Sequence, residues 1–166
     1  MFSLTLSRPL SVADVVALLA ALAPPGLRLL VQPPGAEVPD DIRGVWVTLE
    51  PTRDPAWPLG LVVHTDAFDL GPYPDLRLAE HIAERFGADV LCGAEPSLAG
   101  VDPDDPYYAL ALVGGRWHLA STAFTRLHAS GEEPDDEPVM LIRPVAVDTR
   151  RRGEHHWHGG PDQKGV

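Results

Sequence analysis

The chain has 166 residues, of which 45% are hydrophobic and 22% are charged, and its formal net charge is -11 at pH 7. This length suits one compact domain, and the hydrophobic fraction is too high for a disordered acidic chain. No apolar run approaches the roughly 18 residues of a membrane-spanning helix. The sequence therefore predicts a soluble globular domain without a membrane span.

The charge is unevenly distributed along the chain. Residues 1–142 hold eight basic and 21 acidic side chains, whereas residues 143–166 hold five basic and three acidic ones. Such an excess of carboxylates repels a nucleic-acid backbone and an anionic membrane, and it attracts a basic protein. We therefore expect a basic protein partner, no nucleic acid and no membrane. Acidity that serves solubility alone is the competing explanation.

The first elements are a strand and an apolar helix. Residues 2–6 alternate between apolar and polar side chains, which predicts a strand with one buried face. Ser11 is a good N-cap with Asp14 three residues later, and residues 12–23 are apolar on nearly every side. This segment imitates the apolar core of a secretory signal, but Asp14 interrupts it. We expect a deeply packed helix instead.

Three strands follow before the second helix. Residues 27–31 predict a strand after a Pro-Pro-Gly turn. Residues 45–49 and 59–64 alternate in the same way as the first strand, and they predict two strands that pair through the loop at 51–58. Together these segments predict a mainly antiparallel sheet.

The second helix has the clearest amphipathic pattern. Asp75 is predicted to cap it and Gly87 to end it, and residues 88–92 predict a short strand after it. Polar residues occupy the rest of the helix surface, which predicts one buried side. Its apolar stripe consists of Ala79, Ile82, Ala83 and Phe86.

Residues 107–122 predict a hairpin. Two apolar segments flank Gly114 and Gly115, and two glycines suit a type I′ turn. This turn fixes the register of the two strands, and we expect the face of the hairpin that carries Leu110, Leu112, Trp117 and Leu119, here called the first face, to belong to the core. The pairs predicted on that face are Leu112 with Trp117, Leu110 with Leu119, and Tyr108 with Ser121.

The end of the chain predicts an edge strand and a tail. Residues 129–138 are too acidic for a core, and residues 139–147 form a strand that Pro144 confines to a sheet edge. Residues 148–166 are predicted to be a disordered tail. The whole pattern predicts a single α+β domain over residues 1–147, with a mainly antiparallel sheet of about six to eight strands and two helices packed on one face.

The common phosphate-binding, zinc-protease, serine-hydrolase and EF-hand motifs are absent from the sequence. His64, Asp66 and Asp69 lie where a predicted strand leaves the sheet, and an imidazole with two carboxylates suits a metal ion or proton transfer. A metal-dependent or acid/base enzyme is therefore one alternative. The other interpretation is that the two carboxylates bind loop N–H groups.

Two further groups of residues, a histidine cluster and the single cysteine, are weaker candidates for a metal site or a nucleophile. His155, His156 and His158 form an imidazole cluster, but they lie in a Gly-rich tail without a rigid shell to orient them. Cys92 ends an apolar strand without a basic neighbour, so we expect a buried, unreactive thiol. A single cysteine forms no intramolecular disulfide, which favours a cytoplasmic location. We expect no metal and no cofactor.

The aromatic residues suggest recognition of a partner. Trp46 falls on the polar side of its strand, Trp57 lies in a Pro-rich loop, and Tyr73 flanks another loop. Exposed Trp and Tyr beside carboxylates are typical of an interface for a basic protein. The predicted partner-binding residues are Trp46, Trp57, Tyr73, Asp102, Asp104 and Asp105.

In composition and architecture the chain resembles the small acidic cytoplasmic immunity proteins of bacterial toxin systems. The shared features are a single α+β domain, acidic loops such as residues 102–105, the hairpin at 107–122 and the absence of a catalytic motif. The resemblance implies a non-catalytic protein that binds and neutralises a basic toxin, and it implies no functional residue by position. A homo-oligomeric structural subunit, such as a homodimer, is a further alternative.

Overall fold

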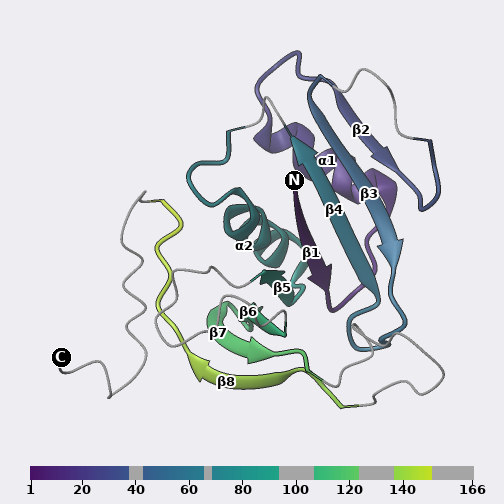
Figure 1. Ribbon diagram of the computed structural model, residues 1–166. Coiled ribbons are helices and arrows are strands. Elements are labelled where there is room, and N and C mark those ends of the chain that lie inside the picture. Colours follow the sequence, from purple (N-terminus) through teal and green to yellow (C-terminus); the bar gives the residue numbers. More distant parts are fainter. Residues whose placement is uncertain (38–42, 66–68, 94–106, 124–136, 151–166) are drawn as a thin grey trace.

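The computed structural model describes residues 1–37, 43–65, 69–93, 107–123 and 137–150. These residues form two helices and one eight-stranded sheet (Figure 1). The sheet order is β2-β3-β4-β1-β5-β6-β7-β8, and every neighbouring pair is antiparallel except β2 and β3. The predicted α+β fold is confirmed. The elements are β1 (Phe2–Leu6), α1 (Val12–Leu22), β2 (Leu29–Gln32), β3 (Val45–Pro51), β4 (Leu59–Thr65), α2 (Pro74–Phe86), β5 (Val90–Gly93), β6 (Tyr108–Val113), β7 (Arg116–Ser121) and β8 (Met140–Pro144).

One face of the sheet, here called the covered face, packs against both helices. Alternate residues of the strands point to this face, and they form one core cluster with the buried sides of α1 and α2. Within the described residues, neither helix is long and apolar enough to cross a membrane. The least exposed large side chains of the core include Leu4, Leu6, Leu19, Leu61, Leu76, Ile82 and Leu110.

Helix α1 begins with the predicted capping box. Asp14 N–H donates to Ser11 Oγ at 3.1 Å, and Ser11 N–H donates to Asp14 Oδ2 at 2.9 Å. These bonds lower the pKa of the Asp14 carboxyl, with a smaller contribution from nearby Arg8 and Arg85. The prediction that the helix is deeply packed is wrong. Its buried residues are confined to one side, and Val16 on the other side is 38% exposed.

Helix α2 begins two residues earlier than a cap at Asp75 predicts. Tyr73 is the N-cap and Pro74 opens the helix, because the fixed φ of proline suits the first helical position. Asp75 therefore lies in the first turn, where burial raises the pKa of its carboxyl despite hydrogen bonds from the backbone of Leu76 and of Asp75 itself. The predicted end is confirmed, because Gly87 has a φ of 62° and caps the helix.

The predicted hairpin and its register are confirmed. Gly114 and Gly115 have φ values of 56° and 77°, and Leu110 pairs with Leu119 as expected. Part of the second face of the hairpin is also buried, which the sequence did not indicate. On that face Trp57 covers a small cluster made of Leu91, Ala109, Ala111 and Ala120.

The chain after β8 packs along α2. Val145 N–H donates to Trp117 O at 3.0 Å, and Thr149 Oγ donates to Glu80 Oε2 at 2.9 Å. Thr149 is 3% exposed. Residues 148–150, predicted to begin a disordered tail, are therefore held against the fold, and residues 151–166 lie outside the described residues.

This contact predicts the effect of two truncations. A chain that ends at Asp148 is expected to be less stable by about 1 kcal/mol than a chain that ends at Arg150, because it loses the buried hydrogen bond to Glu80. In a domain of this size that difference lowers Tm by about 2 to 4 °C. Thermal melts of the two chains measure it, and equal melting temperatures would contradict the contribution of Thr149.

Candidate functional site

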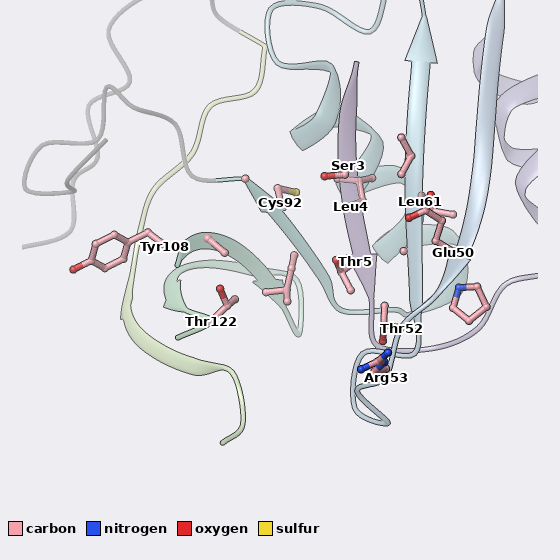
Figure 2. A pocket seen from close by; sticks show the side chains of 16 residues that line it. Ser3, Leu4, Thr5, Glu50, Thr52, Arg53, Leu61, Cys92, Tyr108 and Thr122 are labelled. Carbon is pink, nitrogen blue, oxygen red and sulfur yellow. The ribbon is translucent and has the colours of Figure 1, made fainter. Parts of the chain in front are cut away.

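The face of the sheet opposite the helices, here called the open face, carries a depression of about 550 Å³. Figure 2 shows β1 crossing it, with Glu50, Thr52 and Arg53 on one side and Thr122 on the other. The lining residues come from five strands, β1, β3, β4, β5 and β6, and from the ends of two connections. They are Ser3, Thr5, Glu50, Thr52, Arg53, Val62, Leu91, Ala109 and Thr122, together with Gly60 and Gly93.

The depression is hollow because its floor consists of small residues. Gly60 pairs with Glu50 in the β3–β4 ladder, and a Cβ at Gly60 would lie 3.3 Å from the Glu50 carbonyl oxygen. Gly93 ends β5, and a Cβ there would meet nothing within 4 Å. Ala109, opposite Gly93 in β6, adds a single methyl group. Larger side chains at these positions would fill the space.

The β3–β4 connection forms a rigid wall of the depression. Thr52 N–H donates to Pro58 O at 3.0 Å, and Trp57 N–H donates to Asp54 O at 3.2 Å. Asp54 is 7% exposed, and its Oδ1 accepts a hydrogen bond from Ala56 N–H at 2.8 Å. These bonds and the packing of Trp57 on the open face fix the backbone that carries Arg53.

The opposite wall is held in a similar way. Thr122 is 4% exposed, its N–H donates to Tyr107 O at 2.7 Å, and its hydroxyl donates to the same carbonyl at 3.0 Å. Tyr107 follows the last undescribed residue before β6, and its side chain is 42% exposed. An exposed tyrosine therefore lies beside a fixed polar wall.

The charges of the depression are available to a ligand. Glu50 and Arg53 are both exposed, and neither makes an ion pair within the described residues. With the hydroxyls of Ser3 and Thr5 they offer hydrogen-bond donors and acceptors on a concave surface. No described histidine or thiol side chain lines the depression, so its chemistry suits polar recognition.

Cys92 touches the depression with its backbone, while its side chain belongs to the core of the covered face. Burial raises the pKa of the Cys92 thiol well above its usual range, and the negative charges of Asp75 and Glu80 add to this effect. A buried thiol with a raised pKa is a poor nucleophile. The predicted burial of Cys92 is confirmed.

A second, polar hollow of about 480 Å³ lies between α2 and residues 147–150. Two of its charged groups bind each other, because Arg77 Nη1 is 2.7 Å from Glu80 Oε2, and the same oxygen accepts the Thr149 hydroxyl. His81 Nε2 is 3.4 Å from Arg77 Nη2. The depression on the open face, with its unpaired charges, is therefore the stronger candidate.

The predicted tryptophan anchors are buried. Trp46 is 6% exposed, it stacks on His64 with ring centroids 4.5 Å apart, and its Nε1–H donates to Gln32 Oε1 at 3.1 Å. Trp57 is 8% exposed over the second core cluster. The expectation of exposed tryptophans is therefore wrong, because neighbouring side chains cover both rings. Tyr73 is half-buried against the main core.

The His64 region does not form a metal cluster within the described residues. His64 packs its ring on Trp46, and Asp69 Oδ1 accepts a hydrogen bond from Gly71 N–H at 2.7 Å. In the described part of the chain, no three histidine, cysteine, aspartate or glutamate side chains gather around a possible ion. Several predicted residues lie outside the described ranges, namely Asp66, Asp102, Asp104, Asp105, His155, His156 and His158.

The described residues are nearly balanced in charge. They contain nine arginines and eleven aspartates and glutamates, so most of the net charge of -11 is carried by residues outside the described ranges. The sheet and helices themselves therefore provide a mixed surface, on which an unpaired carboxylate such as Glu50 is a local feature.

Sequence reasoning missed Glu50, Arg53 and Gly93 as site residues. The alternation of β3 places Glu50 on the polar side of its strand, which was the available signal, but that it lines the same depression as Gly93 depends on the sheet order. No family model, no curated protein and no solved structure matches the chain. The depression is therefore the feature of the protein that points to a function.

Proposed function

We propose that the protein is a non-catalytic binding protein that recognises a basic protein partner and neutralises it, as an immunity protein neutralises a toxin. The observation that carries the proposal is the concave depression on the open face with the exposed carboxylate of Glu50 on its wall, which makes no ion pair with another described residue. A lysine or arginine side chain of the partner can pair with Glu50 in this hollow and donate to its hydroxyl groups, while Arg53 on the same wall can pair with a carboxylate beside it.

The strands that line the depression are joined by acidic segments of the sequence. β5 ends at Gly93 and β6 begins at Tyr108, while β7 ends at Ser121 and β8 begins at Met140, all at one end of the sheet. The connections between them, residues 94–106 and 124–136, lie outside the described residues. Their sequences contain one basic residue, Arg126, and the acidic residues Glu95, Asp102, Asp104, Asp105, Glu132, Glu133, Asp135 and Asp136.

The acidic connections and the depression have different roles in the proposed binding. The acidic connections attract a basic partner at long range and raise the association rate. The depression then provides the short-range contacts that slow dissociation, with Glu50 as the charged contact and the exposed Tyr107 as an aromatic contact beside it. Tyr107 thus takes the role that the sequence assigned to the buried tryptophans.

Adding bulk inside the depression is expected to weaken partner binding without unfolding the protein. Gly93→Val adds a side chain into open space at an extended strand position, where valine is favoured over glycine. We expect the dissociation constant for the partner to rise by at least about tenfold, because a side chain can no longer enter the hollow. Affinity purification from the native host, followed by surface plasmon resonance with the recovered protein, measures this change.

Two comparisons make the test specific. Ala146→Val adds the same kind of bulk at an exposed position that does not line the depression, and it is expected to leave binding unchanged. Replacing Asp102, Asp104 and Asp105 by asparagine is expected to slow association and flatten its dependence on salt. Recovery of an acidic partner, or normal binding by Gly93→Val, would contradict the proposal. An activity that depends on His64 would favour the enzyme alternative instead.

A further inference from the structure

The depression on the open face is elongated across the strands. Its lining residues come from β3, β4, β1, β5 and β6, which are consecutive in the sheet order. Cross-strand pairing places Gly60 between Glu50 and Thr5, and Ala109 of β6 lies at the far end. The four strand spacings between β3 and β6 make the depression a groove about 19 Å long. Figure 2 shows β1 passing through the middle of this groove.

Gly93 is a glycine that the fold itself does not require. It is not among the glycines with a positive φ, so other residues adopt its backbone conformation as readily. A Cβ there would meet nothing within 4 Å, so packing does not exclude a side chain either. Glycine weakens a strand, and its presence in one marks a place where a ligand or another backbone approaches closely. Gly93 therefore indicates that the groove accepts a polypeptide backbone from outside.

The width of the groove suits an extended chain. A volume of about 550 Å³ over this length leaves a mean cross-section of about 29 Å², or about 5 by 6 Å. Extended backbones pack beside one another at about 4.8 Å, so one such chain fits this width. A helix with its side chains is about 10 to 12 Å wide, which is too wide to enter.

The two ends of the groove differ in chemistry. Glu50 and Arg53 lie exposed at the β3 end, and neither makes an ion pair with another described residue. The small residues Gly93 and Ala109 lie toward the β6 end. Between them the hydroxyl group of Thr5 is available to donate to a carbonyl oxygen or to accept from an N–H group. An occupant therefore carries its charge at one end and small side chains at the other.

We propose that the groove binds one extended segment of about six residues of the partner, lying across the strands. A lysine or arginine of this segment pairs with Glu50, and small side chains of the segment lie over Gly93. This inference rests on the proposed function, because it names the form in which the same site recognises its basic partner. The partner is thus recognised through a continuous stretch of its sequence, and not through residues gathered from several of its elements.

A single basic side chain is the competing occupant. It would pair with Glu50 at the β3 end and leave the groove near Gly93 and Ala109 empty. That interpretation gives no reason for the glycine at position 93, whereas an extended segment uses the whole length of the groove.

Selection from a phage library of linear peptides tests the proposal without knowledge of the partner. Peptides of about seven residues form no stable helix in water, so their binding reports an extended segment. We expect the selected sequences to share a lysine or arginine with a small residue about four positions away, because three strand spacings separate Glu50 from Gly93. Selection on Gly93→Val is expected to lose this shared pattern.

Fluorescence polarisation of the most enriched peptide measures the charged contact. Glu50→Lys is expected to raise the dissociation constant by at least about tenfold, as is replacement of the basic residue of the peptide by alanine. Glu84→Lys makes the same charge change at an exposed position of α2 that does not line the groove. It is expected to leave the dissociation constant unchanged at physiological salt, which screens exposed charges beyond about 8 Å.

Photo-crosslinking tests the orientation of the segment. A benzophenone group at the basic end of the peptide is expected to label residues 50–53, and one at the other end is expected to label residues 108–109 or Thr122. Mass spectrometry of the labelled protein distinguishes these positions. Labelling of the same wall from both ends, or labelling of α2, would overturn the proposal.

The outcomes separate this inference from the proposed function. Selected peptides without a shared basic residue, or a pattern that survives on Gly93→Val, would overturn the extended segment. If Gly93→Val weakens a recovered basic partner while no linear peptide is enriched, the partner presents a composite surface, so the inference fails and the proposed function stands. Enriched basic peptides that depend on Gly93, without a basic protein in the native host, would support the groove and overturn the neutralising function.

Discussion

Replacing Gly44 by alanine is expected to lower the free energy of unfolding by about 3 kcal/mol or more. Gly44 is buried just before β3 and has a φ of 129°, which alanine rarely adopts. A Cβ at this position would also overlap the backbone carbonyl oxygen of Arg28. That carbonyl accepts a hydrogen bond from Val45 N–H at 3.0 Å, where the parallel pairing of β2 and β3 begins. The substitution therefore strains the backbone and displaces a strand.

Gly35→Ala is the matched control for this prediction. Gly35 has a φ of 75°, but a Cβ there would meet nothing within 4 Å. It is expected to cost about 1 kcal/mol, from backbone strain alone. Urea denaturation of both variants measures the difference, which isolates the overlap with Arg28. Equal losses in the two variants would show that β2 moves aside at little cost.

The elements that the sequence predicted well are those fixed by neighbouring residues. The capping box of Ser11 and Asp14 and the turn at Gly114 and Gly115 each depend on a few consecutive side chains. The hairpin register follows from the turn alone, so it was predicted pair by pair. The start of α2 was predicted wrongly, because Pro74 occupies the first helical position and Asp75 therefore lies inside the first turn instead of capping it.

The features that the sequence did not predict depend on contacts between distant segments. β1 lies between β4 and β5, so Ser3 and Thr5 meet residues 50–53 and Gly93 on one surface. No spacing within a single segment indicates this meeting. The depression could therefore be located from the folded sheet, but it could not be located from a motif.

The tryptophans illustrate the limit of strand alternation. Trp46 does lie on the open face, as its position in β3 predicted, but stacking on His64 and a hydrogen bond to Gln32 bury it there. Alternation predicts which face a side chain occupies, and it does not predict what covers that face. The same reasoning explains α1, whose apolar composition predicted burial although the fold covers a single side.

Leu110→Ala and Trp117→Ala are each expected to lower the free energy of unfolding by about 2 to 5 kcal/mol. Leu110 is 0% exposed between Cys92 and Leu119, and Trp117 is 8% exposed opposite Leu112. Both side chains belong to the main core, so their removal loses buried apolar area and leaves a cavity. Neither position has backbone strain that alanine would relieve.

Arg116 provides the control within the same hairpin. It is exposed next to Gly115, so Arg116→Ala is expected to change the free energy of unfolding by less than about 0.5 kcal/mol. The contrast between Trp117 and its neighbour Arg116 reports which face of β7 packs on the helices, because a shift of one residue would exchange their positions. Urea denaturation of the three variants measures this contrast. Similar losses for Trp117→Ala and Arg116→Ala would be incompatible with the observed register.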